Sequence, residues 1–164
     1  MPSRKILQLP DEKTLASARK HFEVFLKKQE LKMTSQRVEI LQRVAGMDRH
    51  FNADEILEAF RRKKSKPSKA TIYRTLNLLA ECDILEEHNI KQESSVVYEF
   101  AWGRDHHDHM ICLSCGTILE FVDEAIETRQ DEVCEEKGFH PTFHSQKIYG
   151  ICSVCWDEKG VRSV

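Results

Sequence analysis

The four-cysteine pattern in the second half of this chain constrains its fold more than any other feature. It consists of two Cys-x-x-Cys pairs, Cys112 with Cys115 and Cys152 with Cys155. Each pair turns the backbone so that two thiolates can face one ion, and two pairs supply the sulfur tetrahedron that structural zinc prefers. The long stretch between the pairs must therefore fold back and bring them together. A redox disulfide is the alternative, but it needs one pair beside the start of a helix rather than two matched pairs.

The first residues of the chain and its cysteine content indicate the cellular compartment in which the protein is expected. The segment from Met1 to Glu12 contains charged residues and two prolines but no long apolar run, so we expect neither a signal peptide nor a membrane span. We therefore expect a reducing, cytoplasmic location, where six cysteines indicate metal binding rather than disulfides. Cys82 and Cys134 lie outside the paired pattern, and we expect them to be small buried apolar residues.

The charge of the chain is unevenly distributed. With 164 residues, 40% of them hydrophobic, the chain can form one domain or two small ones. Up to Leu85 there are 18 Lys and Arg against 11 Asp and Glu, a balance of +7; beyond it there are 7 against 16, a balance of −9, and the two sum to the net charge of −2. The basic half suggests a polyanionic partner and the acidic half suggests cations, although lysine-rich faces are commonly only solvated surface.

Four segments of the basic half have the apolar spacing of amphipathic helices, the first over residues 12–30. The others are bounded by residues that cap helices or interrupt them: Thr34, Ser35, Gly46, Asn52, Glu55, Pro67 and Ser68. The residues expected on the buried faces are Leu15, Ala18, Phe22, Phe25, Leu26, Val38, Leu41, Val44, Ala45, Ile56, Leu57, Phe60, Ile72, Leu76 and Leu79.

The third and fourth segments have the pattern of a helix-turn-helix, whose second helix enters the major groove of DNA. The outer face of the fourth segment is basic and aromatic, with Lys69, Tyr73, Arg74 and Asn77. Two β-prone runs follow at 84–90 and 95–100, and residues 91–94 can join them as a hairpin. This order predicts a winged helix-turn-helix.

Particular side chains of this half suit DNA. Tyr73 can lay its ring against thymine methyl groups, and Arg74 can donate to a guanine edge or to a phosphate. Salt-dependent phosphate contacts are expected from Lys32, Arg61, Arg62 and Lys69. In the alternative interpretation, Tyr73 only completes the helix packing and the basic side chains are only solvated.

A histidine cluster, His106-His107-Asp108-His109, precedes the first cysteine pair. On an extended strand His107 and His109 point to one face while His106 and Asp108 point to the other, so one tetrapeptide can serve two sites. Histidines with carboxylates suit iron, manganese or zinc. Further candidate ligands lie beside a helix expected to carry Val122, Ile126 and Val133, and on a return strand expected to end at Tyr149: Glu120, Glu127 and His144.

Two longer strings of residues are specific enough to suggest a family. They run from Ala70 to Leu76 (Ala-Thr-Ile-Tyr-Arg-Thr-Leu) and from His106 to Gly116. Shorter motifs accompany them: Lys32-Met33-Thr34 with Arg37, His50-Phe51-Asn52-Ala53, Glu120-Phe121, Glu127, His144 and both cysteine pairs. From about Leu15 to Trp156 the chain closely resembles the ferric uptake regulator family of bacterial metal-responsive regulators.

The resemblance implies an α+β protein that represses transcription on a double-stranded DNA operator as a homodimer or a tetramer. Its winged helix-turn-helix domain would cover residues 1–102, and a small α/β dimerisation domain with the four-cysteine zinc site would cover 103–164. The family positions that touch DNA match Lys32, Tyr73 and Arg74.

The resemblance also implies three metal sites. The structural zinc site matches Cys112, Cys115, Cys152 and Cys155. The regulatory site matches His50, Glu99, His107, His109 and Glu120, with Asp105 as the alternative to Glu99. An additional site matches His106, Asp108, Glu127 and His144.

The division of the regulatory ligands suggests a switch. His50 and Glu99 belong to the first domain and the other three to the second, so an ion bound by all five would fix the orientation of the DNA-binding domains. The two glutamates favour Fe²⁺ sensing, with Mn²⁺ or Zn²⁺ able to replace it, over the peroxide-sensing branch, where aspartates are expected. Zinc-sensing and manganese-sensing members are further alternatives, because the affinity order of the metals does not select iron.

A metallohydrolase is the alternative from a different class. It would use the cluster from His106 to His109, with Asp108 or Glu120 as the base, and would need an open coordination position and a substrate pocket. It leaves the basic helices unexplained, so we expect a protein that is not an enzyme.

Overall fold

The computed structural model describes residues 10–61, 66–89 and 96–159. The described chain forms two compact units: the first contains the residues up to Asn89 together with those from 96 to Arg104, and the second begins at Asp105. None of the helices in these ranges is long and apolar enough to cross a bilayer.

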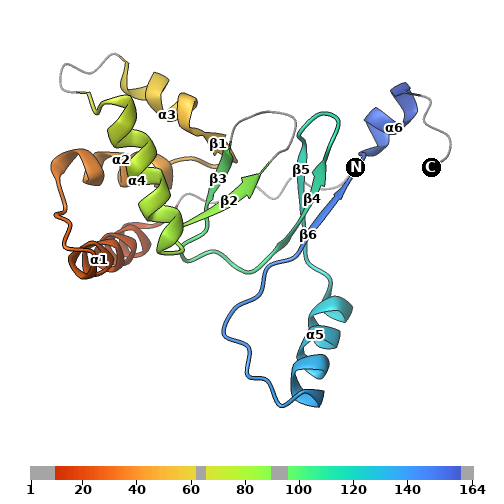
Figure 1. Ribbon diagram of the computed structural model, residues 1–164. Helices are drawn as coiled ribbons and strands as arrows, with labels where there is room; N and C mark the ends of the chain where they lie inside the picture. Colours follow the sequence, from red (N-terminus) through yellow and green to blue (C-terminus); the bar gives the residue numbers. More distant parts are fainter. Residues whose placement is uncertain (1–9, 62–65, 90–95, 160–164) are drawn as a thin grey trace. The chain divides into compact units, whose positions relative to one another are not determined.

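The first unit contains four helices (Figure 1): α1 (Glu12–Lys28), α2 (Ser35–Ala45), α3 (Ala53–Phe60) and α4 (Lys69–Glu81). Each begins after a side chain that accepts a hydrogen bond from an N–H of the first turn: Asp11, Thr34, Asn52 and Ser68. At α3 the exchange with Glu55 is reciprocal, which forms the predicted capping box. The helix starts predicted for α2, α3 and α4 are confirmed.

A three-stranded antiparallel sheet completes the first unit. Its strands are β1 (Phe51–Asn52), β2 (Leu85–Asn89) and β3 (Val96–Phe100), in the order β1-β3-β2. The predicted pairing of β2 with β3 is confirmed, whereas the connecting residues 91–94 lie outside the described residues. Helix-turn-helix and hairpin together form the expected winged-helix unit.

The core of the first unit draws on all four helices and on the sheet. The predicted inward-facing residues that are at most 2% exposed are Ala18, Phe22, Leu26, Leu41, Val44, Ala45, Ile56, Phe60, Ile72, Leu76 and Leu79. Leu15, Phe25 and Leu57 are partly buried and pack against this core, and Ile40 is a fully buried member that the apolar stripe of α2 did not include. Large apolar side chains contribute roughly 1.5–3 kcal/mol each when buried, so the core holds the α4 backbone firmly while its outer face stays exposed.

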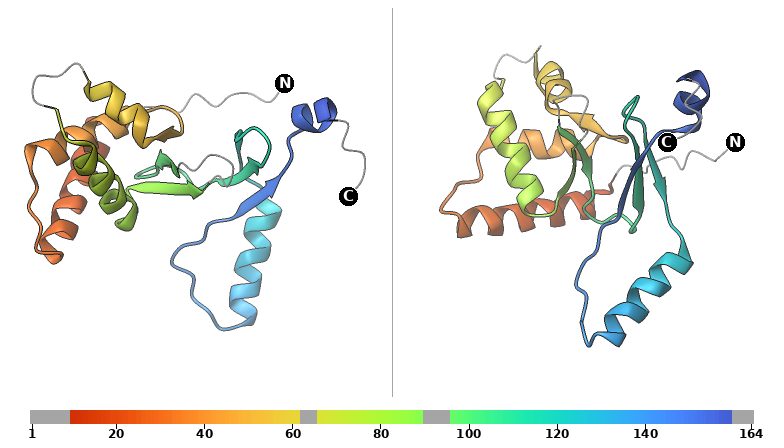
Figure 2. Two further views of the ribbon diagram at one scale, coloured as in Figure 1. Left: turned by 45° about the horizontal axis from the view of Figure 1, so that its top comes forward. Right: turned by 45° about the vertical axis from the view of Figure 1, so that its right-hand side comes forward.

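The second unit contains a different sheet and two helices. Its strands are β4 (Asp108–Cys112), β5 (Ile118–Phe121) and β6 (Lys147–Gly150), in the order β5-β4-β6. The central strand β4 pairs antiparallel with β5 and parallel with β6. The helices are α5 (Glu124–Glu136) and α6 (Ser153–Lys159). Helix α5 projects beyond one end of the sheet rather than covering one of its faces (Figures 1 and 2).

The second unit buries little apolar surface of its own. No residue of α5 is buried, and the buried apolar side chains among the described residues of this unit are Ile111, Cys112 and Cys155. Large apolar side chains are exposed instead, including Leu119 at 50%, Phe139 at 65% and Phe143 at 77%. Apolar burial within the single chain therefore contributes little to the stability of this unit.

Three expectations about the second unit are wrong in detail. Val122 precedes α5 and is exposed, so it is not carried by that helix. His144 lies in the loop before β6 rather than on the strand, because α5 ends away from the sheet and the chain needs a loop to return. Cys134 is half-buried on α5, whereas Cys82 is buried as expected. Burial raises the pKa of the Cys82 thiol to about 11, so this cysteine is chemically inert.

Candidate metal sites and DNA-binding face

The four paired cysteines meet at one end of the second sheet. Cys112 ends β4, and the parallel partner of Cys112 on β6 is Gly150, so the chain beyond β6 delivers Cys152 and Cys155 beside the first pair. The sulfur atoms all lie within 4.8 Å of one another, with 3.7 Å between Cys115 Sγ and Cys152 Sγ. A zinc tetrahedron with bonds of about 2.3 Å has sulfur edges of about 3.8 Å. The folded segment between the pairs brings them together as a four-sulfur site.

The electrostatics of this cluster favour a bound cation. The backbone N–H of Cys152 donates to Cys112 Sγ and lowers the pKa of that thiol to about 6, and the hydroxyl of Thr117 lowers the pKa of Cys115. The hydroxyl of Ser114 lowers the pKa of Cys155, but Cys115, burial and the other thiols outweigh it and raise that pKa to about 12. Four thiolates cannot share this space without a positive ion. The donor set therefore fits a soft divalent metal of the zinc type.

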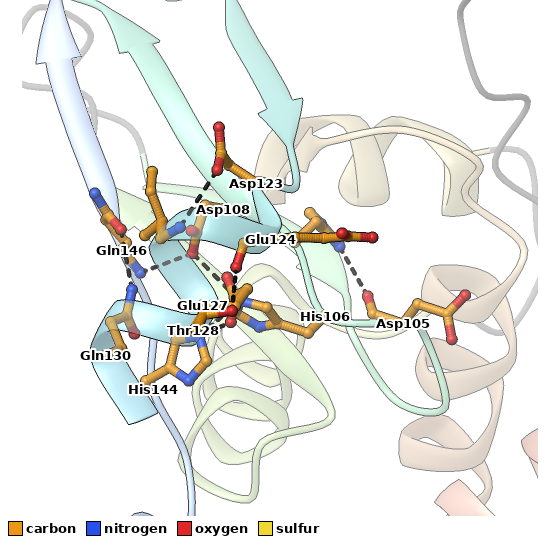
Figure 3. A network of polar contacts seen from close by, with 12 residues as sticks. Asp105, His106, Asp108, Asp123, Glu124, Glu127, Thr128, Gln130, His144 and Gln146 are labelled. Atoms are coloured by element: carbon orange, nitrogen blue, oxygen red, sulfur yellow. Dashed lines mark hydrogen bonds and ion pairs between the residues drawn. The ribbon is translucent and has the colours of Figure 1, made fainter. Parts of the chain in front are cut away.

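A second cluster in the same unit combines two histidines with two carboxylates (Figure 3). His144 Nε2 lies 2.8 Å from His106 Nε2 and 3.0 Å from Glu127 Oε2, and His106 Nε2 lies 3.4 Å from both Asp108 Oδ1 and Glu127 Oε1. The ligand atoms of these four residues lie within 4.8 Å of one another. The structure thus brings together the four residues assigned to the additional site.

Local structure explains how this second cluster is assembled. Asp123 caps α5 and so places Glu127 in the first turn of the helix, facing the sheet end. The backbone N–H of Gln146 donates to Asp108 Oδ1, whereas Asp108 Oδ2 is buried without a hydrogen-bond partner among the described residues. A buried carboxylate oxygen without a donor is costly unless a cation meets it. Imidazole and carboxylate donors converging on one point fit a borderline divalent ion.

The first unit holds two of the five residues assigned to the regulatory site. His50 directly precedes β1, and the pairing of β1 with β3 brings it beside Glu99, with 3.1 Å between His50 Nε2 and Glu99 Oε2. Two further residues gather at the same carboxylate. His88 Nε2 lies 3.9 Å from Glu99 Oε2, and Arg104 forms an ion pair with Glu99 Oε1.

Sequence reasoning did not include His88 and Arg104. In the β2–β3 register Glu86 is opposite Glu99 and His88 is opposite Val97, so His88 and Glu99 share one face of the hairpin as diagonal neighbours. That relation depends on the register of the β2–β3 pairing, which the alternation of side chains along one strand does not fix. The sequence did contain one usable signal for His88: the alternation of side chains along β2 places it on the same face as Glu86.

The second unit holds the other three residues assigned to the regulatory site. His109 and Glu120 are opposite one another in the β4–β5 register, and the rings of His107 and His109 lie 4.9 Å apart in an edge-to-face arrangement. Strand β4 begins at Asp108, so His107 precedes it. The two halves of the assigned regulatory set thus lie on different units. Asp105, the alternative to Glu99, is exposed, and its carbonyl oxygen lies 3.0 Å from His107 Nδ1.

The outer face of α4 carries the residues predicted to read DNA. Lys69, Tyr73 and Arg74 are all exposed. Asp54, on the first turn of α3, accepts a hydrogen bond from the Tyr73 hydroxyl at 3.3 Å and lies 3.7 Å from Lys69 Nζ. The ammonium group of Lys69 also lies 5.3 Å from the centre of the Tyr73 ring. One acidic side chain thus holds two side chains of the reading face in place.

Positive charge is concentrated near the start of α2. Lys32 is exposed before this helix, and its carbonyl oxygen accepts a hydrogen bond from Arg37. Burial lowers the pKa of Arg37, and the neighbouring charge of Arg74 adds to this effect. Two guanidinium groups that repel one another form a natural phosphate site. Arg61 is exposed and pairs with Glu58, while Arg62 lies outside the described residues.

A winged-helix unit with a basic reading face, followed by a unit that gathers four thiols and a histidine–carboxylate cluster, defines a metal-binding transcription regulator. Comparison with known proteins identifies the family. The family model described as the ferric uptake regulator family matches residues 28–149. The ferric uptake regulation protein of Legionella pneumophila is 37% identical over 131 residues, which cover 79% of this chain and 95% of that protein. The chain belongs to the ferric uptake regulator family.

Solved structures agree with this assignment. The Helicobacter pylori ferric uptake regulator, described as having three functional metal binding sites, superposes with a TM-score of 0.71 at 32% identity, over 90% of this chain and 95% of that one. The Pseudomonas aeruginosa regulator, solved with manganese, gives a TM-score of 0.66 at 32% identity, over 78% of this chain and 95% of that one. The predicted fold class, an N-terminal winged-helix domain followed by a dimerisation domain with a four-cysteine cluster, is confirmed.

Proposed function

We propose that this protein represses transcription by binding operator DNA when a divalent metal, Fe²⁺ in the cytoplasm, occupies its regulatory site. The observation that carries the proposal is the division of the assigned ligands between the units. His50 and Glu99 belong to the DNA-binding unit, and His107, His109 and Glu120 belong to the other unit. An ion bound by ligands from both units would restrict the orientation of one unit relative to the other.

Restricting that orientation matters because a dimer must present two reading helices at once. The half-sites of a near-palindromic operator are about one helical turn of DNA apart, or a multiple of it. Side chains on α4 can engage both half-sites only in poses that match this spacing. A coupling free energy of about 1 to 3 kcal/mol between metal and DNA would change operator affinity about 5- to 150-fold. By reciprocity, operator DNA would tighten metal binding by the same factor.

The second unit supports assembly through a second copy of the chain. Its exposed apolar residues, among them Leu119, Phe139 and Phe143, would be covered when two copies associate. Helix α5 has no buried residue in the single chain, which is expected of a helix that packs against a partner. We infer a homodimer as the operator-binding form, with a tetramer formed from two such dimers as the alternative.

The choice of metal rests on the donor sets. The four thiols suit Zn²⁺ held permanently, because a closed tetrahedron of sulfur leaves no open position. The regulatory residues are imidazoles and glutamates without a cysteine, which suits Fe²⁺, and Mn²⁺ or Zn²⁺ can replace it. Relatives solved with manganese and with iron fit this range. Sensing of peroxide, manganese or zinc at the same residues remains the alternative, because affinity alone does not select iron and the metal bound depends on availability.

The proposal is tested by operator affinity under defined metal loading. Purified protein with its zinc retained is titrated anaerobically with Fe²⁺, Mn²⁺ or Zn²⁺, and fluorescence anisotropy measures binding to a near-palindromic duplex selected from random sequence. Wild-type protein should bind the duplex more tightly with metal, and Fe²⁺ should act within its cellular range. His107→Ala should stay folded and dimeric but lose the response. Equal affinity of the metal-loaded and metal-free wild type would refute the proposal.

A further inference from the structure

The two oxygens of the Glu99 carboxylate have different surroundings. Oε2 lies on the histidine side, 3.1 Å from His50 Nε2 and 3.9 Å from His88 Nε2. Oε1 lies on the other side and pairs with the guanidinium group of Arg104. The Glu99 side chain is fully buried, and that of Arg104 is only 15% exposed. The carboxylate is thus shared between an imidazole face and a fixed cation.

The backbone after β3 turns so that the guanidinium group of Arg104 reaches Glu99. After β3, the backbone N–H of Ala101 donates to Ile84 and that of Arg104 donates to Ala101, so the segment turns back toward the strand it has just left. Gly103 makes the turn with a φ of 73°, and a Cβ at that position would lie 2.8 Å from Thr14 Cγ2. A glycine is therefore required for Arg104 to reach Glu99.

A buried carboxylate needs a positive partner, because its desolvation costs several kcal/mol. A neutral imidazole can offer the carboxylate a hydrogen bond but no charge, whereas the guanidinium group is always charged. Arg104 therefore provides the fixed positive charge next to Glu99 before metal binds. Once a divalent ion sits on the imidazole side of the same carboxylate, Arg104 becomes a neighbouring like charge.

We propose that Arg104 is a built-in counter-cation of Glu99 that raises the metal concentration at which the regulatory site fills. The inference rests on the proposed function and names a positioning residue rather than a ligand. Arg104 stabilises the metal-free protein by pairing with Glu99, and it repels the ion in the loaded protein. Both effects weaken metal binding. By pairing with Glu99 Oε1, Arg104 thus sets the metal concentration at which the regulatory site fills.

The test compares charge-removing and charge-keeping variants. Arg104→Gln removes the charge, Arg104→Lys keeps it, and Arg19→Gln is the matched control, because Arg19 is an exposed arginine on α1 of the same unit. All proteins carry His144→Ala, which disables the second cluster, and zinc content is measured throughout. Mn²⁺ affinity is obtained by competition with a chelating dye, and thermal unfolding is followed without added Mn²⁺.

Arg104→Gln should bind Mn²⁺ about tenfold more tightly, as expected when a like charge is removed from beside an ion in a partly buried site. The same variant should unfold at a lower temperature without Mn²⁺. Arg104→Lys and Arg19→Gln should stay close to the parent protein in both measurements. Weaker or unchanged Mn²⁺ binding by Arg104→Gln would overturn the proposal, because Arg104 would then assist the ion or have no influence on it.

A double-mutant cycle separates this inference from the proposed function. In the metal-free protein, Glu99→Gln should remove most of the destabilisation caused by Arg104→Gln, because the neutral side chain no longer needs a cation. Additive losses would contradict the pairing. If Glu99→Gln alone leaves Mn²⁺ affinity unchanged, the assigned regulatory site is wrong, whatever the cycle shows about the ion pair.

Discussion

Removal of the zinc proposed for the four-cysteine site should unfold the second unit and leave the first unit folded. Structural zinc contributes about 10 to 16 kcal/mol to the folding of small domains. The described part of the second unit has a single fully buried large apolar side chain, Ile111, which is worth roughly 1.5–3 kcal/mol. That core cannot replace the metal. The first unit has its own core from four helices and a sheet, with no thiol cluster among its described residues.

The chain contains two tryptophans, and each lies in a different unit. Trp102 belongs to the first unit, where its Nε1 donates to Ser17 Oγ at 2.8 Å and its ring lies 4.4 Å from that of His21. Trp156 belongs to α6, directly after Cys155. Single-tryptophan variants Trp102→Phe and Trp156→Phe therefore report on one unit each. Zinc extraction by a strong chelator should lower the fluorescence anisotropy of Trp156 and shift its emission to the red, while the signal of Trp102 stays unchanged.

Metal analysis must accompany the fluorescence, because incomplete extraction would mimic a stable unit. Cys134→Ser is the matched control: Cys134 is outside the cluster, so this variant should keep both its zinc and its Trp156 signal. Retention of the native Trp156 signal after complete zinc loss would refute the reasoning, since the small core would then suffice. If the fluorescence signals of Trp102 and Trp156 both change on zinc loss, the two units unfold together, and the expected independence of the first unit is wrong.

Three further predictions concern the DNA-binding face and the thiols. Arg74→Ala should weaken operator binding by about 1–3 kcal/mol with zinc content unchanged, and anisotropy titrations showing wild-type affinity would exclude α4 as the reading helix. Asp54→Asn should strengthen binding to unrelated duplex DNA several-fold at low salt, because a negative charge beside Lys69 and Tyr73 is lost; weaker binding would show that Asp54 acts by positioning instead. Without metal, the backbone N–H of Cys152 lowers the pKa of Cys112 to about 6, so its thiolate is already favoured at neutral pH and is lost as the pH falls through about 6. Because protons compete with zinc for the thiolates, zinc transfer to a chelating dye should accelerate as the pH falls, and a flat pH profile would contradict this competition.

Local signals were sufficient to predict the helices of the first unit. Thr34, Asn52 and Ser68 each cap a helix through a hydrogen bond spanning three residues, so neighbouring residues alone decide where the helix begins. The apolar spacing then identified most of the buried positions, because a helix has a fixed period. The cysteine pairs were equally informative, since metal chemistry restricts which residue spacings can close a site.

Features that depend on non-local geometry were harder to predict. His88 and Glu99 meet only through the register of β2 and β3, and Arg104 reaches Glu99 only because Gly103 turns the chain. His144 was expected on a return strand ending at Tyr149. The loop that actually holds His144 exists because α5 projects past the sheet, which no local pattern encodes.

The three ligand sets differ in a way that assigns them different roles in the proposed switch. The four thiols and the cluster around His106 each lie within the second unit, so a metal in either one can stabilise that unit but cannot by itself select its orientation relative to the DNA-binding unit. Only the assigned regulatory ligands are divided between the units. A ligand shifts a conformational equilibrium only through a difference in its affinity for the two states. Substitutions of the assigned regulatory ligands should therefore change the response of DNA binding to metal. Substitutions in the other two ligand sets should instead change the stability of the second unit.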